Sequence, residues 1–169
     1  TGWYLDAALT QPITSLTLEA DTTVYAGWRI RNPFVDVAEK DYFYDAVLWG
    51  VENGVVKGMD EMHFEPETVC TRAQALTFLW RANGMPQPKT TTNPFVDVDA
   101  SAYYYDAVLW GVENGIVKGM DETHFEPDTA CSRAQALTFL WRAKGMPQAS
   151  GTTFADVPAP FGEKKAGTM

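Results

Sequence analysis

Hydrophobic side chains recur at intervals of three and four residues between Tyr42 and Asn53. This spacing places them on one face of an amphipathic helix, whose period is 3.6 residues. The positions concerned are Tyr44, Val47, Leu48 and Val51. Gly54 comes next, where a residue in the left-handed conformation commonly ends a helix. The pattern therefore predicts a short helix that ends near Asn53.

A second helix is predicted from its first turn. Thr71 and Gln74 have the spacing of a capping box, in which the side chains of the first and fourth residues each accept the other's backbone amide. Ser132 and Gln135 repeat the device. The apolar face then continues to about Ala82, followed by stop signals. The apolar residues and stop signals are Leu76, Leu79, Trp80, Gly84 and Pro86.

The two helices and the polar loop between them occur twice. Residues 32–88 and 93–149 align at a constant offset into 57 pairs, of which 12 differ, so 45 are identical. A repeat of this length is marginal as an independent core, so we expect the two copies to pack together. A third copy begins at Phe154 and then loses the helical pattern, and we assign residues 152–169 to a truncated or divergent third repeat.

The first 30 residues have a different character. Residues 16–21 and 23–28 are rich in β-branched and aromatic side chains, with a turn signal between them. Residues 1–30 are therefore interpreted as the C-terminal part of a small β module. Because the chain starts at Thr1, we read it as a piece of a longer polypeptide.

Composition narrows the possible functions. The chain has 169 residues, of which 46% are hydrophobic, and this suffices for one ordinary domain or two small ones. Its 22 acidic residues against 13 basic ones give a formal charge of -9, which argues against nucleic acid or an anionic membrane surface as partner. No apolar run approaches the roughly 18 to 20 residues of a membrane helix.

Several motifs recur in fixed order within each copy. They are Phe-x-Asp-Val, Tyr-x-Asp-Ala-Val-x-Trp-x-x-Glu-Asn-Gly, Lys-Gly-Met-Asp, Phe-x-Pro and Thr/Ser-Arg-Ala-Gln. In this order they resemble the S-layer homology repeat of bacterial surface proteins. The N-terminal stretch, with Gly2-Trp-Tyr-Leu-Asp6, resembles the closing half of a Listeria-Bacteroides type surface repeat, a short extracellular β spacer.

The resemblance implies a mainly α fold in which helix-loop-helix repeats pack as a partial pseudo-threefold bundle. It also implies a non-covalent anchor that binds secondary cell wall polysaccharides, often pyruvylated, in grooves between repeats. On this reading the module is extracellular, at the cell wall or cell surface of a bacterium. It is non-catalytic and needs no cofactor.

The resemblance places an Arg at the start of the second helix against the acidic sugar, and here these positions are Arg72 and Arg133. Physical chemistry supports this role, because the first turn of a helix presents free amides and a guanidinium binds carboxylate with two hydrogen bonds. Gln74 and Gln135 replace the Glu of the family motif and join the candidate site. The alternative is that the two arginines pair with Glu67 and Asp128.

Glycines and tryptophans complete the candidate site. Gly58 and Gly119 are expected either to line the groove or to provide turns with positive φ. Trp49 and Trp110 could stack on sugar rings, although their helical positions, like those of Trp80 and Trp141, favour core packing. Asp36 and Asp97 are expected to cap the first helix or to form an Asx turn before it.

Other chemistries find little support. His63 with Cys70, repeated as His124 with Cys131, has no standard zinc spacing, and the cysteines are expected to pack on the first helical turn. A disulfide between the two cysteines is left open. The acidic loop residues Asp60, Glu61 and Glu65 do not form a calcium-loop pattern, and no catalytic motif is present.

The sequence thus predicts a wall anchor that recognises an acidic polysaccharide and inserts in no membrane. The alternative is a module that binds another protein or copies of itself, because an incomplete third repeat would leave apolar helix faces open. An enzyme acting on wall glycans would need an active site outside these residues.

Overall fold

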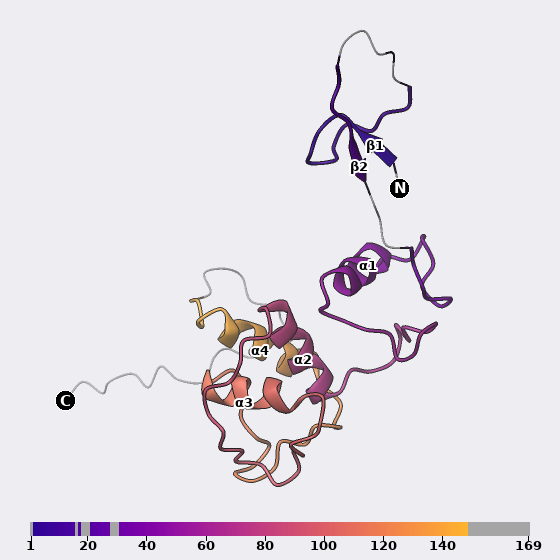
Figure 1. The fold of residues 1–169 in the computed structure, drawn as a ribbon. Coiled ribbons are helices and arrows are strands. Elements are labelled where there is room, and N and C mark those ends of the chain that lie inside the picture. Colours follow the sequence, from indigo (N-terminus) through magenta and orange to yellow (C-terminus); the bar gives the residue numbers. More distant parts are fainter. Residues whose placement is uncertain (1, 16, 18–20, 28–30, 149–169) are drawn as a thin grey trace, which may run out of the picture.

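The computed structural model describes residues 2–15, 17, 21–27 and 31–148 (Figure 1). Its elements in chain order are β1 (Gly2–Tyr4), β2 (Tyr25–Gly27), α1 (Tyr44–Glu52), α2 (Arg72–Ala82), α3 (Tyr105–Glu113) and α4 (Arg133–Ala143). The prediction of a mainly α fold with a small N-terminal β module is confirmed. The third repeat expected over residues 152–169 lies outside the described residues.

The β module is a two-stranded antiparallel sheet in which β1 pairs with β2, and Trp3 lies opposite Ala26. The later of the two stretches predicted to be rich in β structure supplies β2, whereas most of the earlier one, residues 16–21, is not among the described residues. Residues 16 and 18–20 lie outside the described part of the chain. A side chain at Gly27 would collide with the ring of Tyr4, so the pairing requires glycine at that position.

The local signals at the ends of the helices are confirmed. The Thr71 hydroxyl accepts the amide of Gln74 at 3.2 Å, and the Gln74 side chain accepts the amide of Thr71 at 2.9 Å. Ser132 and Gln135 repeat both bonds at 3.2 and 2.9 Å. Gly54 comes after α1 with a φ of +67°, so it ends the helix in the left-handed conformation, as its position predicted.

Asp36 and Asp97 do not cap the first helices, and that prediction is wrong. The N-caps of α1 and α3 are Phe43 and Tyr104, without a side-chain bond. Asp97 instead accepts the amides of Phe125 and Glu126 at 2.9 and 2.7 Å, and Asp36 holds the corresponding loop of the first copy. Each carboxylate therefore ties together two loops that are 28 residues apart.

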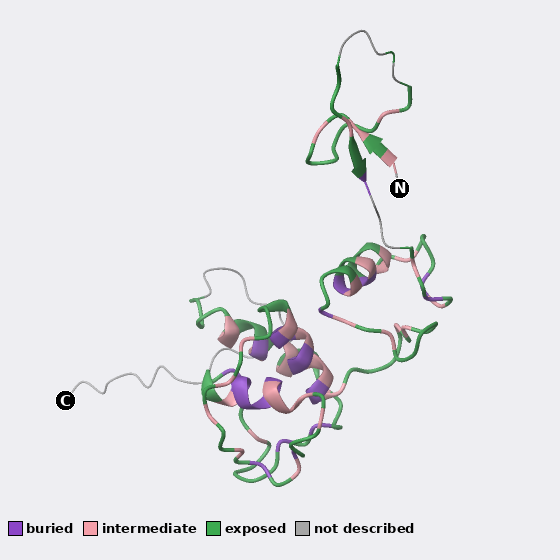
Figure 2. Cartoon of the chain, viewed as in Figure 1, coloured by how far each residue is buried: buried purple, intermediate pink, exposed green. Residues whose placement is uncertain are grey.

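The main core lies where the two copies meet. α2 of the first copy packs against α3 and α4 of the second (Figure 2), which confirms the expectation that the copies pack together. The core contains residues of all three helices, and its members from α2 are Leu76, Leu79 and Trp80.

α1 has a small cluster of its own. This cluster contains Phe34, Val37 and Val47, with Phe64 packed against it. Within the described residues α1 contacts none of the other helices. The second helix of the first repeat therefore packs on the first helix of the second repeat, and α4 completes this core through its contacts with α2.

Candidate binding groove at the repeat junction

The start of α2 is held by the second copy. The amide of Arg72 donates to the carbonyl oxygen of Thr129 at 2.9 Å, and the amide of Ala73 donates to that of Pro127 at 3.0 Å. The expectation that the first turn presents free amides is therefore wrong for α2. The neighbouring chain segment has already satisfied the donors that a helix start leaves open.

The side chain of Arg72 is buried at the same junction, with 3% of its surface exposed. Its Nε donates to the carbonyl oxygen of Phe125 at 3.0 Å and its Nη2 to that of Lys118 at 3.2 Å. The guanidinium also lies over the Phe125 ring, 4.8 Å from the ring centroid. Burial lowers the pKa of Arg72 from its ordinary value, but guanidinium groups stay charged in proteins. Arg72 therefore brings a fixed positive charge to the junction.

Arg133 occupies the same position in α4 and lies in a different environment. Its side chain is exposed. The alternative prediction, that the two arginines pair with Glu67 and Asp128, is wrong, because the ion pairs in the described part of the chain are His63 with Asp60 and His124 with Asp121. Of the two arginines, Arg72 alone is packed against a neighbouring repeat in the described structure.

A hollow of about 280 Å³ lies beside Arg72. Three basic side chains and no acidic one line it, and these cations come from the start of α2, the loop before α4 and the last turn of α4. The lining residues are Arg72, Lys118, Gly119, Ala134, Gln135, Thr138, Phe139 and Arg142. We call this hollow the junction groove. It is positively charged in a chain whose formal charge is -9.

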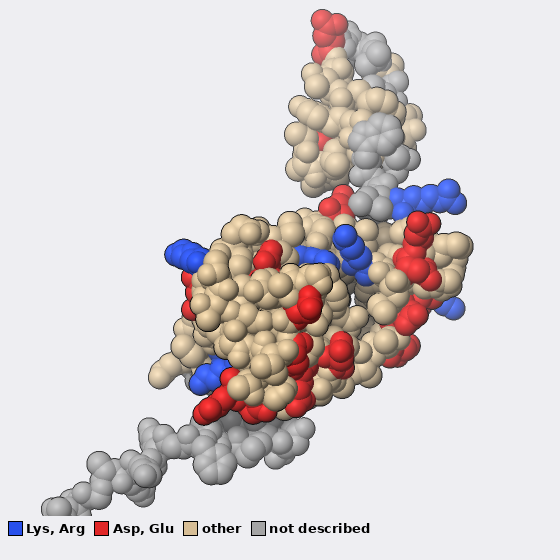
Figure 3. All heavy atoms as spheres, turned by 60° about the horizontal axis from the view of Figure 1, so that its bottom comes forward, with Lys and Arg blue, Asp and Glu red and all other residues tan. Residues whose placement is uncertain are grey.

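The rest of the molecule has the opposite balance. On the face shown in Figure 3, acidic side chains are spread over the surface, and basic ones stand singly among them. A local cluster of cations is what an acidic ligand would require on such a protein, because the overall field repels it.

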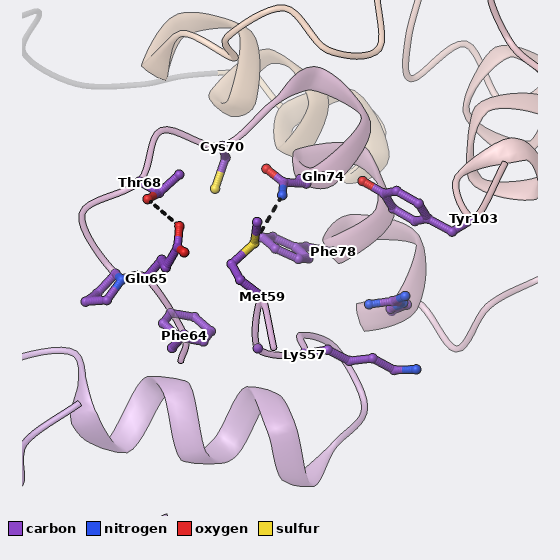
Figure 4. Close-up of a pocket in the computed structure, with 12 residues that line it drawn as sticks. Lys57, Met59, Phe64, Glu65, Thr68, Cys70, Gln74, Phe78 and Tyr103 are labelled. Atoms are coloured by element: carbon purple, nitrogen blue, oxygen red, sulfur yellow. Dashed lines mark hydrogen bonds between the residues drawn. The ribbon is translucent and has the colours of Figure 1, made fainter. Parts of the chain in front are cut away.

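The first copy has an equivalent hollow of about 410 Å³, which we call the first-repeat hollow (Figure 4). Lys57, Gly58, Gln74 and Arg81 correspond there to Lys118, Gly119, Gln135 and Arg142. The charged groups of the two hollows differ in two ways. No arginine takes the place of Arg72, and the carboxylate of Glu65 lies in the lining, where it accepts the hydroxyl of Thr68 at 3.0 Å.

Gly58 and Gly119 each line one of these hollows. Their expected alternative, a turn with positive φ, is wrong, because neither has a positive φ. A side chain at Gly119 would collide with the backbone of Asp121 and His124 and with the ring of Phe95. Gln74 and Gln135 close their capping boxes and also direct their side-chain nitrogens to Met59 and Met120, at 3.8 and 3.9 Å from the sulfurs.

The tryptophans line neither hollow. Core packing is confirmed for Trp110 and Trp80, each 8% exposed. Their counterparts Trp49 and Trp141 are 56% and 44% exposed. Identical local sequences therefore have different surroundings in the two copies.

Sequence reasoning missed Lys118 and Arg142. Lys118 directly precedes Gly119 in the Lys-Gly-Met-Asp motif. Because Gly119 was already a candidate site residue, its position in the sequence could have pointed to Lys118. Arg142 lies two turns beyond Gln135 on α4, and its Nη1 donates to the carbonyl oxygen of Ile116 at 3.2 Å. Only the fold brings these residues next to Arg72, which is 46 residues before Lys118.

The polar loop residues have local roles. Nδ1 of His63 lies 2.9 Å from the carboxylate of Asp60, and Nδ1 of His124 lies 3.0 Å from that of Asp121. Backbone amides lower the pKa of Asp121 to about 2.

Among the residues described, no group of three or more His, Cys, Asp or Glu side chains is placed to hold a metal ion. None of the described helices has the length and hydropathy to cross a membrane.

Comparison with known proteins gives one consistent family. The family model described as "S-layer homology domain" matches residues 33–76 and 94–137. Each match begins just after the Asn of one copy and ends in the middle of α2 or α4.

Three relatives are surface-layer or cell wall proteins by name. The "Surface-layer 125 kDa protein" of Lysinibacillus sphaericus is 35% identical over 99 residues, which cover 59% of this chain and 8% of that protein. The "S-layer protein sap" of Bacillus anthracis is 32% identical over 111 residues, or 65% of this chain and 13% of the relative. The "Middle cell wall protein" of Brevibacillus brevis is 28% identical over 95 residues, or 54% and 9%. The chain thus spans a small part of each relative's length.

Proposed function

Because the chain belongs to the family of S-layer homology domains, we propose that it binds an acidic secondary cell wall polysaccharide, such as a pyruvylated one, in the junction groove. The chain is an extracellular module of a bacterial cell-surface protein and serves to anchor it at the cell wall. The polysaccharide and the groove residues are our proposal.

The observation that carries the proposal is the convergence of Arg72, Lys118 and Arg142 without a carboxylate among the lining residues. Arg72 forms the fixed floor, since two of its donors already bind carbonyl oxygens. Lys118 is exposed at the rim and remains free to turn toward a carboxylate. Charge-assisted bonds of this kind are worth about 1.5 to 3 kcal/mol each, and a repetitive polymer would multiply them through avidity.

We propose that this module is non-catalytic and that it only binds its partner. The small β module fits the same picture as a spacer of the Listeria-Bacteroides type that holds the anchor away from its cargo. The resemblance of Gly2 to Asp6 and of residues 18–28 to such a repeat is what supports the spacer.

The test compares two lysines at equivalent positions. Lys118 lines the junction groove, and Lys57 lines the first-repeat hollow, which has no Arg72 counterpart. We expect Lys118→Gln to weaken binding to purified Gram-positive cell walls about tenfold, the effect of losing one charge-assisted bond. Lys57→Gln should leave binding nearly unchanged. Arg72 is unsuitable for this purpose, because its removal would leave two carbonyl groups at the junction without a donor.

Walls are assayed before and after chemical removal of the secondary polymer, and with the pyruvyl groups removed. Loss of binding on stripped walls supports polysaccharide recognition, and loss on depyruvylated walls assigns the carboxylate. Undiminished binding to stripped walls would overturn the function. Equal binding by the Lys118 and Lys57 variants would overturn the assignment to the junction groove.

A further inference from the structure

This chain contains two pairs of helices with identical sequences, and the two members of each pair are packed to different extents. α1 and α3 share the sequence YDAVLWGVE, and α2 and α4 share RAQALTFLWRA. α2 and α3 pack against each other. α1 has no helix partner among the described elements, and α4 has α2 only.

The apolar face of α4 is open to solvent at the positions that α2 buries. Leu137, Leu140 and Trp141 are 67%, 48% and 44% exposed. Their equivalents Leu76, Leu79 and Trp80 are 0%, 8% and 8% exposed. In the packed pair, Leu76 lies directly over Gly111 of α3, whereas the corresponding Gly50 lies in α1, which α4 does not contact in the described structure.

The first copy is open at the positions that α2 covers in the second copy. Trp49 is 56% exposed where Trp110 is 8% exposed. Ala46 is exposed where Ala107 is buried, and Phe64 is half-buried where Phe125 is fully buried. The interface between α2 and the second repeat is already present once in this molecule. The open face of α4 is equivalent to one half of that interface, and the open face of the first repeat is equivalent to the other half.

The polar groups match in the same way. The amides of Arg72 and Ala73 donate to the carbonyl oxygens of Thr129 and Pro127. The equivalent amides of Arg133 and Ala134 have no acceptor in the described structure. Thr68 and Pro66 carry the equivalent carbonyl oxygens in the first copy. The start of α4 therefore has two amide donors, and the first copy has the two carbonyl acceptors, at the positions that are hydrogen-bonded to each other at the start of α2.

We infer that α4 of one molecule docks on the first repeat of a second molecule in the way that α2 packs on the second repeat. The occupant of the open α4 face is then α1 of another copy of this chain, since its sequence is identical to that of the helix that α2 already binds. The contact is head-to-tail, so it leaves one open face at each end and continues beyond a dimer unless a ring closes.

Docking places Arg133 where the first-repeat hollow lacks a cation. Arg133 would lie over Phe64 and Phe78, as Arg72 lies over Phe125 and Phe139 at 4.8 and 5.7 Å from the ring centroids. The hollow would then hold Arg133, Lys57 and Arg81, beside the carboxylate of Glu65 that already lines it. This second groove rests on the proposed function, whereas the docking itself does not.

The test uses two variants that each remove one face. Leu137→Glu blocks the α4 face and Trp49→Glu blocks the α1 face. Both residues are exposed in the single molecule, so folding should persist, which far-UV circular dichroism verifies. By sedimentation velocity, we expect the mean mass of the unaltered chain to rise above 18.7 kDa with concentration. Each variant alone should stay at 18.7 kDa, and an equimolar mixture of the two should form a one-to-one dimer.

Val96→Glu is the control. Val96 is 76% exposed and its equivalent Val35 is 65% exposed, so this position lies outside the contact in both copies. The control should associate like the unaltered chain. Leu140→Glu replaces Leu137→Glu if the latter loses helix content.

Three outcomes would overturn the inference. One is an unaltered chain that remains monomeric at every concentration, including the case in which α1 folds onto α4 of its own molecule. Another is a mixture of the two variants that forms no dimer. The last is association that persists in either single variant. None of these measurements involves a polysaccharide, so failure here is distinguishable from failure of wall binding.

Discussion

The backbone amide of Cys131 donates a hydrogen bond to the carbonyl oxygen of Cys70 at 2.9 Å. The adjacent residues Thr71 and Ala130 form an antiparallel bridge. The two cysteines, one from each repeat, therefore lie opposite each other across the junction. Both thiols are free.

Oxidation should join these cysteines. Opposite residues of an antiparallel pair have Cα atoms about 4.5 to 5.5 Å apart, within the span that a disulfide permits. We expect diamide to take two hydrogen atoms from the thiols and form an intrachain disulfide. Mass spectrometry would show a loss of about 2 Da, the two hydrogens of the thiol pair, and thiol titration would fall from two groups to none. A chain that keeps both thiols, or links only to other chains, would contradict this arrangement.

Leu76 and Leu137 provide a matched pair of core and surface positions. Leu76→Ala should lower the free energy of unfolding by about 2 to 5 kcal/mol, because it opens a cavity between α2 and α3. Leu137→Ala should change it by less than about 0.5 kcal/mol, because that side chain is exposed. Urea denaturation at low protein concentration, where copies do not associate, measures both values. Similar losses for the two variants would mean that α4 is covered within a single molecule.

Asp97 is expected to hold the loop that closes the core. In Asp97→Ala the amides of Phe125 and Glu126 lose their acceptor, which should cost about 1 to 3 kcal/mol of the free energy of unfolding. Asp36→Ala removes the same bonds in the first copy, outside the main core, and serves as control. Its effect on the main urea transition should be smaller, and an equal effect would show that both copies unfold as one unit.

His63 should titrate above its ordinary range. The hydrogen bond and charge of Asp60 raise the pKa of His63 from 6.5. The protonated imidazole is therefore favoured in the folded chain, so its stabilising effect is complete below pH 6.5 and is lost as the pH rises through the raised pKa. NMR titration should find a midpoint above 6.5, and Asp60→Asn should lower it. A midpoint that does not respond to Asp60→Asn would refute the pair.

Local features of this fold could be predicted from sequence. The capping boxes at Thr71 and Ser132 were predictable because every atom involved lies within four residues. The left-handed Gly54 was predictable from its position after an apolar helix. These devices depend on side chains and backbone within a few residues of each other and therefore appear in both copies alike.

Features that join distant segments were not predictable. Asp97 reaches a loop 28 residues away, and no local pattern separates that role from helix capping. Arg72 and Arg133 lie in nearly identical sequences, yet only Arg72 is buried. The difference arises because the second copy packs over the start of α2, whereas the start of α4 is exposed. A position's own sequence cannot specify its neighbours in space.

The pairing of α2 with α3 has a consequence for the history of the chain. The stretch that was duplicated runs from Asn32 to Pro88, but the pairing of α2 with α3 joins the second half of one copy to the first half of the next. Duplication and folding are thus out of phase by half a period. A cut between Asn53 and Thr71 spares the core, whereas one at the copy boundary, between residues 88 and 93, divides it. Each added copy would close one more core and leave the same two unfinished halves at the ends.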